Sequence, residues 1–299
     1  MSELTIWRKY CEHFDPYCRV TRLRKGCEPK VITRRGATKS IVLTHGLSDS
    51  PYYMADIANF FADQLGYNVY LPLLHCHGLK KPAGMESVEL EEWKRNVRWA
   101  VDQAHLATPG HVSVGGLSTG GALSFYMACT SQKVTGDLYL LSAALGLNAI
   151  GSSLAGKILQ NMLRSRKLVD FLDHRDADKP LIGNNPFKYA YVDKDGAYQL
   201  ARLIRELDGL IDDFSRKQPF TKRVFAAHSH ADDTASIDAI KKLQRRTKVF
   251  VADYIPAKKA VTHGGLTLKA DVRADDGTLC TPANAVWNDM MSKVRQFAH

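Results

Sequence analysis

The sequence lacks long apolar runs. Its opening stretch, MSELTIWRKYCEHF, has no continuous hydrophobic segment and no A-x-A site, so it does not form a secretory signal. No segment approaches the ~20 apolar residues that a transmembrane helix needs. Provided that no leader has been removed from the chain, these absences predict a soluble, cytoplasmic protein without a transmembrane segment.

Cysteine motifs are lacking as well. The six cysteines are scattered, without a C-x-x-C pair or the spacing of a zinc site. In a chain of 299 residues an even count does not argue for a disulfide framework, so we expect free thiols in a reducing compartment. No structural metal is expected.

Acidic residues are scarce near the N-terminus. The first forty positions hold ten Lys or Arg against four Asp or Glu, and they supply +6 of the net charge of +10. Such a stretch can contact nucleic acid or anionic lipid. Aromatic side chains are not interleaved with the basic ones, which favours a solvated basic face. We expect no nucleic-acid partner and keep peripheral membrane contact as an alternative.

Short apolar runs and helical patterns alternate along the rest of the chain. Most of the runs lack a clean polar alternation, which is typical of strands buried on both faces of a parallel sheet. The runs cover residues 40–45, 68–74, 111–117, 137–145, 223–229 and 248–254. Helical patterns follow at 90–101, 119–130, 236–246 and 283–297. This order predicts an α/β fold with a doubly wound, mostly parallel sheet.

The segment 146–220 interrupts the alternation. It holds no strong strand, whereas Leu203, Leu207, Leu210 and Phe214 recur at helical spacing. A stretch of about 75 residues is too long for one crossover in a compact domain. We therefore predict a core domain of residues 1–145 and 221–299 with a helical cap inserted at 146–220. The cap is interpreted as a lid, and packing helices without contact to a site are the alternative.

Residues 113–121 read SVGGLSTGG and crowd Ser118 with glycine. Glycine weakens strands and helices, so this density needs a reason. If a strand ends at Leu117 and a helix starts at Thr119, Ser118 stands on a sharp corner. Bulk at Gly116 or Gly120 would then clash. The G-x-S-x-G pattern in this context predicts an exposed nucleophilic serine.

A serine nucleophile needs a base and an acid that orients it. His263, in AVTHGGL, follows the last predicted strand by a short loop and has no evident structural task. The acid lies in SHADDTAS, at Asp232 or Asp233. A divalent metal held by these carboxylates with His228 and His230 is the alternative, but it would leave His263 and the Ser118 turn unexplained.

The oxyanion of an acyl-transfer reaction needs two backbone N–H donors. Thr119 follows the nucleophile and begins its helix, where the macrodipole also favours negative charge. Leu47 follows His45-Gly46 at the end of an early strand. A simple turn at the end of that strand is the alternative interpretation of His45-Gly46. The order serine, aspartate, histidine along the chain is that of the elbow-type hydrolases.

From about residue 38 onward the sequence resembles the α/β-hydrolase superfamily, and within it the carboxylesterase and monoacylglycerol-lipase-like branch. The matching stretches are LTHGLSDSPYYM, VYLPLLHCHG, ELEEWKRNV, GGLSTGG, SHADDTAS and VTHGG. Cys76 departs from the family, which usually has glycine there, and the first 37 residues fit the pattern poorly. The resemblance implies that Asp232, rather than Asp233, is the acid. It also implies a helical cap in the region 146–220.

These observations predict a serine ester hydrolase that needs no cofactor and acts on a small-molecule acyl ester. Ser118, Asp232 and His263 are the expected catalytic residues, with the Leu47 and Thr119 amides as the oxyanion hole. A thioesterase or acyltransferase would use the same triad, and a peptidase is a further alternative. A non-catalytic ligand receptor on the same scaffold is the alternative from another class. A serine argues against the dehalogenase and epoxide-hydrolase chemistries of similar folds, which use an aspartate at the elbow. The oligomeric state is not predicted.

Overall fold

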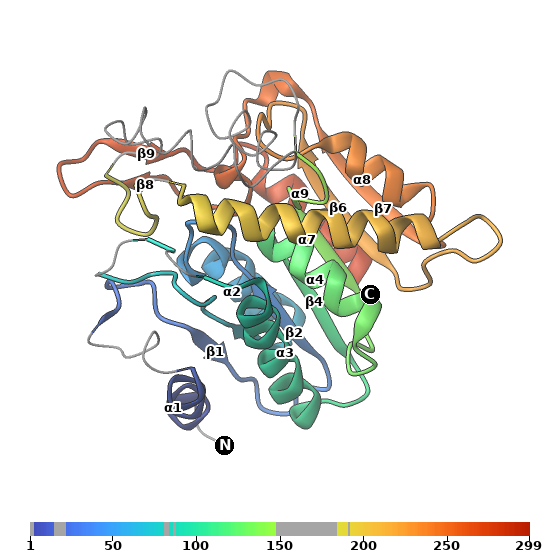
Figure 1. Ribbon diagram of the computed structural model, residues 1–299, viewed down its shortest axis with the longest axis horizontal. Helices are drawn as coiled ribbons and strands as arrows, with labels where there is room; N and C mark the ends of the chain where they lie inside the picture. Colours follow the sequence, from blue (N-terminus) through green and yellow to red (C-terminus); the bar gives the residue numbers. More distant parts are fainter. Residues whose placement is uncertain (1–2, 15–21, 81–83, 86–87, 148–183, 191) are drawn as a thin grey trace.

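A seven-stranded sheet forms the centre of the molecule (Figure 1). The computed structural model describes residues 3–14, 22–80, 84–85, 88–147, 184–190 and 192–299. The strand order is β1-β3-β2-β4-β5-β6-β7, and all neighbours are parallel except β1, which runs antiparallel to β3. The strands are β1 (Lys30–Ile32), β2 (Ser40–Thr44), β3 (Asn68–Leu71), β4 (Val112–Leu117), β5 (Leu138–Leu141), β6 (Val224–Ser229) and β7 (Phe250–Ile255).

All six predicted apolar runs form strands. Every residue of β2, β3, β4, β5 and β6 is buried, as expected for a parallel sheet that is covered on both faces. The runs 68–74 and 137–145 extend past the observed strands, which end at Leu71 and Leu141. Their remaining apolar residues are still buried, because the loops at the carboxyl ends of the strands pack inward.

Helices cover both faces of the sheet, and each face has its own hydrophobic core. One face carries α3 (Leu90–Ala107), α4 (Thr119–Thr130), α7 (Lys194–Asp213) and α8 (Ile237–Gln244). The other carries η2 (Pro51–Met54), α2 (Ala55–Leu65), η4 (Gly264–Thr267) and α9 (Trp287–Ala298). The predicted doubly wound α/β architecture is therefore confirmed.

Helix α7 is the longest described element of the predicted cap. Its N-cap is Asp193, whose side chain accepts hydrogen bonds from the Asp195 and Gly196 amides. Figure 1 shows it in yellow, running across α3 and α4, which it contacts. Its apolar stripe joins the core on that face. Residues 148–183 and 191 lie outside the described residues, so the lid and the domain boundaries stay predictions.

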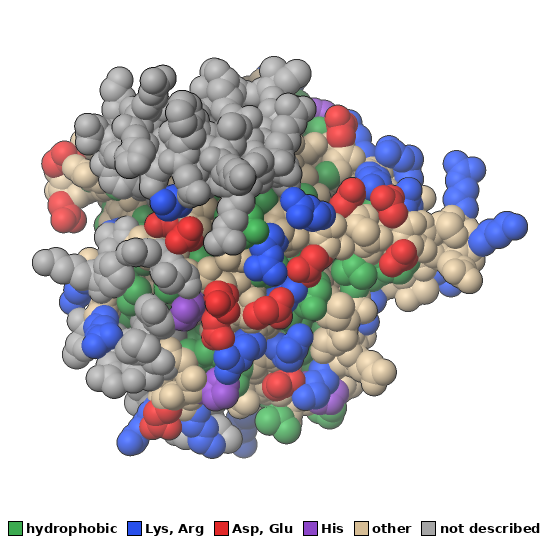
Figure 2. All heavy atoms as spheres, viewed as in Figure 1, with side chains coloured by type: hydrophobic (Ala, Val, Ile, Leu, Met, Phe, Trp, Pro, Cys, Tyr) green, Lys and Arg blue, Asp and Glu red, His purple; other side chains and the backbone are tan. Residues whose placement is uncertain are grey.

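Charges of both signs are interleaved over this face (Figure 2). Lys94 of α3 lies 2.7 Å from Glu206 of α7, and Lys242 of α8 lies 2.6 Å from Asp208. These ion pairs join neighbouring helices. In the described part of this face, positive and negative side chains therefore lie close to one another.

Several described elements were not predicted. They include the helices α1 (Glu3–His13) and α2, the edge strand β1 and the hairpin of β8 (Val272–Arg273) with β9 (Leu279–Thr281). Strands of two or three residues are too short to show a hydrophobic period.

The described cysteines, which exclude Cys18, are free. Among the described helices, none combines the length and apolar character needed to cross a bilayer.

Candidate active site

Ser118 lies on a strained turn between β4 and α4. Its backbone has φ 53° and ψ −116°, a conformation that L-residues rarely adopt. A Cβ at Gly120 would lie 2.0 Å from the carbonyl oxygen of Thr44, and one at Gly116 would lie 2.4 Å from the same atom. The steric reason predicted for both glycines is confirmed.

The predicted site residues follow the carboxyl ends of strands in the parallel part of the sheet. Ser118 follows β4, Leu47 follows β2, and Asp232 follows β6. His263 follows β7 through a loop. In open α/β sheets this edge is where ligands bind.

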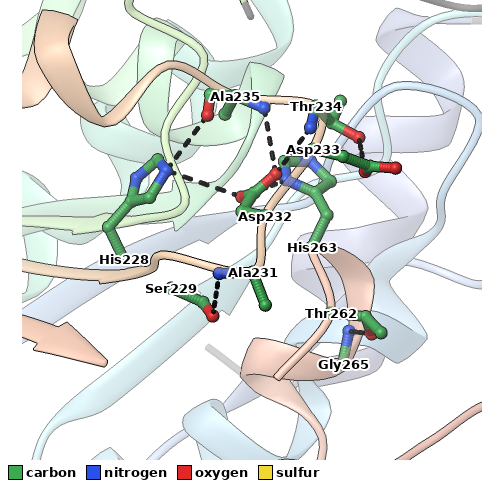
Figure 3. A network of polar contacts seen from close by, with 10 residues as sticks. All are labelled: His228, Ser229, Ala231, Asp232, Asp233, Thr234, Ala235, Thr262, His263 and Gly265. Carbon is green, nitrogen blue, oxygen red and sulfur yellow. Dashed lines mark hydrogen bonds and ion pairs between the residues drawn. The ribbon is translucent and has the colours of Figure 1, made fainter. Parts of the chain in front are cut away.

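Asp232 and His263 lie together (Figure 3). His263 Nδ1 is 2.7 Å from Asp232 Oδ2. The other carboxylate oxygen, Oδ1, accepts hydrogen bonds from the Thr234 amide at 2.8 Å and the Ala235 amide at 3.0 Å. Asp233 is exposed, and its carboxylate accepts a hydrogen bond from the Thr234 hydroxyl. Of the two aspartates, only Asp232 contacts His263 through a hydrogen bond among the described residues.

Asp232 and His263 each stabilise the charged form of the other. Burial alone would raise the pKa of Asp232, but His263 and the accepted hydrogen bonds outweigh burial and hold that pKa below its ordinary value. Burial alone would lower the pKa of His263, but the Asp232 carboxylate outweighs it, so the pKa of His263 is raised. Asp232 is therefore ionised at neutral pH and favours an imidazolium on His263.

A second imidazole lies on the other side of Asp232. His228, at the end of β6, has its Nε2 3.6 Å from Asp232 Oδ2 and 3.1 Å from the Ala235 carbonyl oxygen. Burial lowers the pKa of His228, although Asp232 opposes this. His228 is therefore neutral and donates from Nε2. The contact between His228 and Asp232 was not predicted, because the strand pattern does not reveal which way a buried histidine points.

His45 fixes the peptide plane that carries the Leu47 amide. The Leu74 amide donates to His45 Nε2 at 3.1 Å, so the proton of this neutral ring lies on Nδ1 and is donated to the Gly46 carbonyl oxygen at 2.9 Å. The Asp49 amide donates to the same oxygen at 3.2 Å. In a trans peptide the N–H points opposite to the C=O. The Leu47 N–H therefore points away from His45.

The Thr119 amide begins α4, so it has no acceptor one turn earlier within the helix. It lies directly after Ser118, at the positive end of the helix dipole. Within the described residues the Ser118 hydroxyl forms no hydrogen bond. Ser118 is only 6% exposed, so the prediction of an exposed serine is wrong. In structures without substrate, the hydrogen bond between a nucleophile and its general base is often long, and it shortens when substrate binds.

Metal ligation receives no support from the described residues. They contain no group of three or more His, Cys, Asp or Glu side chains that could hold a metal ion. His230 is exposed, and its ring packs against Tyr254 with 6.3 Å between the centroids. His230 therefore does not join His228 and Asp232 in one cluster.

No protein-family model matches the chain, and no curated protein matches it. Solved structures match it well. A structure reported for LipS and LipT, two metagenome-derived lipolytic enzymes, has TM-score 0.65 and 17% identity over 93% of this chain and 99% of that chain. Monoglyceride lipase from Saccharomyces cerevisiae, in a soluble variant, has TM-score 0.63 and 13% identity over 90% of each chain. The enol-lactonase from Burkholderia xenovorans LB400 has TM-score 0.53 and 14% identity over 90% of this chain and 95% of that chain. The chain has the α/β-hydrolase fold.

Proposed function

We propose that the protein is a serine hydrolase that cleaves carboxylic esters, of the carboxylesterase or monoglyceride-lipase type. One observation carries the proposal: a strained serine and an aspartate-bound histidine both follow the carboxyl ends of parallel strands, at one edge of the sheet. The similarity to lipolytic enzymes and to a monoglyceride lipase supports a hydrolase with an ester substrate.

The proposed reaction begins with attack of Ser118 Oγ on the ester carbonyl carbon. His263 donates from Nδ1 to Asp232, which leaves Nε2 to take the serine proton and pass it to the leaving alcohol. The Leu47 and Thr119 amides stabilise the oxyanion. Water, deprotonated by His263, then releases the acid and regenerates Ser118. No cofactor takes part in these steps.

The test is hydrolysis of p-nitrophenyl esters from acetate to palmitate by the wild type and Ser118→Ala. We expect turnover that is lost in the variant and a chain-length optimum that reports the depth of the acyl pocket. Ser124→Ala is the matched control, because Ser124 is a buried serine of the same helix α4. This control should keep full activity.

Labelling with a fluorophosphonate separates the remaining outcomes. Labelling of Ser118 without turnover of any ester would assign the same nucleophile to a thioesterase or acyltransferase. Loss of both turnover and labelling would contradict a working nucleophile and favour a ligand receptor on this scaffold.

A further inference from the structure

A buried ion pair lies beside the candidate active site. Lys188 Nζ is 2.7 Å from Asp49 Oδ1, and the two side chains are 12% and 5% exposed. The ammonium also lies over the ring of Tyr53, 4.0 Å from its centroid. Burying two charges costs desolvation energy that a surface pair does not incur. None of the proposed catalytic steps uses this pair, so it needs its own explanation.

Two glycines make room for the pair. A Cβ at Gly46 would lie 2.7 Å from Asp49 Oδ2 and 3.2 Å from Ser118 Cβ. A Cβ at Gly264 would lie 2.9 Å from Lys188 Nζ. Gly46 directly precedes Leu47, and Gly264 directly follows His263. The pair therefore fills the space between the oxyanion turn, defined as residues 46–49, and the loop that carries His263.

Main-chain contacts hold Lys188 in this position. The Tyr189 amide donates to the Ser48 carbonyl oxygen at 2.9 Å, and the Tyr189 hydroxyl donates to the Cys76 carbonyl oxygen at 2.8 Å. Arg24 Nη1 donates to the Lys188 carbonyl oxygen at 2.6 Å. The segment 188–189 is therefore tied to the oxyanion turn through both its backbone and its ammonium group.

We propose that Lys188 and Asp49 are positioning residues for the reaction proposed above. Their ion pair holds the oxyanion turn against the loop that carries His263, and it balances the charge that the imidazole experiences. Neither residue touches the reacting atoms in this assignment. The geometric part of the proposal rests on the proposed function, whereas the electrostatic part is measurable without any substrate.

The two charges act on His263 with opposite signs. Among the described residues, the charged groups that act most strongly on its imidazole are Asp232, Lys188 and Asp49, and the ring also interacts with His228. After burial and Asp232, the Lys188 ammonium lowers the pKa of His263 and the Asp49 carboxylate raises it. Removal of Lys188 alone should therefore raise this pKa, and removal of Asp49 alone should lower it. When both residues are removed, the two opposite effects on the pKa of His263 should nearly cancel.

The experiment is an NMR titration of the histidine Cε1–H signals in the full-length protein. The His263 signal is assigned by its absence from His263→Asn. Lys188→Met, Asp49→Asn and the double variant are compared with the wild type. Opposite shifts in the single variants that cancel in the double variant are the expected result. Shifts of the same sign, or no shift, would overturn the proposal.

The double variant guards against failure of a single variant to fold, because loss of one partner leaves an unpaired buried charge whereas loss of both does not. If one single variant does not fold, the other carries the test: a His263 pKa shift of the expected sign that the double variant cancels supports the balance, and an absent or opposite shift contradicts it. Lys94→Met is the matched control. It removes another buried lysine, which pairs with Glu91 and Glu206 and is not among the charges that act on His263. Its His263 titration should match the wild type.

Kinetics then test the geometric part. With ester substrate, we expect the double variant to lose about tenfold or more in kcat, with a much smaller change in KM, since oxyanion contacts act in the transition state. An unchanged kcat in a folded double variant would overturn the positioning role. Wild type that hydrolyses no ester would instead contradict the proposed function, and the NMR titration would still decide the electrostatic part.

Discussion

A methyl group added to a glycine has opposite consequences at two positions of this chain. At Gly120 it would lie 2.0 Å from a backbone oxygen that has no room to move, whereas at Gly209, exposed on α7, it meets nothing within 4 Å. Gly120→Ala should lower the free energy of unfolding by about 3 kcal/mol or more. Gly209→Ala should raise it by about 0.5–1 kcal/mol, because alanine is the better helix former. Urea unfolding of both variants measures the difference, and equal effects would contradict the steric account of the elbow.

The two adjacent aspartates should differ sharply in their effect on activity. Asp232→Asn removes the acceptor that orients His263 Nδ1, and we expect kcat to fall by about 10⁴-fold. Asp233→Asn alters an exposed side chain and should change kcat less than about twofold. Steady-state kinetics on the best p-nitrophenyl ester checks both. A larger loss in Asp233→Asn would move the role of the acid by one residue.

Sequence alone located the residues whose place is set by local rules. Ser118 and its glycines form a strand-to-helix corner. Asp232 and His263 also follow parallel strands, and the shared direction of these strands places all three residues at one edge of the sheet. Lys188 gave no such signal. It lies in a polar segment without a period, and its position depends on contacts with residues more than a hundred positions away.

At the scale of elements, the oxyanion turn depends on the side chain that precedes it. His45→Ala would remove the donor to the Gly46 carbonyl and free the peptide plane that carries the Leu47 amide. We expect kcat to fall by up to about 10²-fold, with KM little changed, because complete loss of one donor costs about 10²–10³-fold. Steady-state kinetics separates the two parameters. A rise in KM at constant kcat would show instead that the turn contributes to ground-state binding.

Elements differed in how well they could be predicted. The five buried parallel strands β2 to β6 are short, continuous apolar runs, and their burial on both faces makes that signal strong. The edge strand β7 alternates between buried and more exposed residues, but its pattern was still recognisable. Strands β1, β8 and β9 were missed, because pairing of two or three residues depends on which chain lies beside them.

For the whole molecule, buried neutral histidines should make stability depend on pH. Burial lowers the pKa of His45 to about 4 and that of His77 to about 3, whereas both would titrate near 6.5 in the unfolded chain. Below pH 6.5 the unfolded chain therefore binds protons that the folded protein excludes. The free energy of unfolding should fall from pH 6.5 to about 4, by up to about 3 kcal/mol for His45 alone. Urea unfolding at several pH values measures this slope.

His77→Phe provides the comparison for that slope. Its ring can keep the contacts with Trp93 and Tyr189 but binds no proton, so the variant should lose less stability between pH 6.5 and 4 than the wild type. His263 acts in the opposite sense. Its pKa is raised, so its contribution is present below pH 6.5 and is lost as pH rises through the folded value. Parallel profiles for wild type and His77→Phe would contradict the role of His77.

The backbone at Ser118 has a consequence for how this chain can evolve. A residue held at φ 53° and ψ −116° costs about 1–3 kcal/mol that glycine would largely recover. A lineage selected only for folding would therefore drift to glycine at this position, keeping its architecture and losing its hydroxyl. If Ser118 is the proposed nucleophile, selection for stability and selection for chemistry oppose each other at this one residue, and the serine persists only while the second outweighs the first.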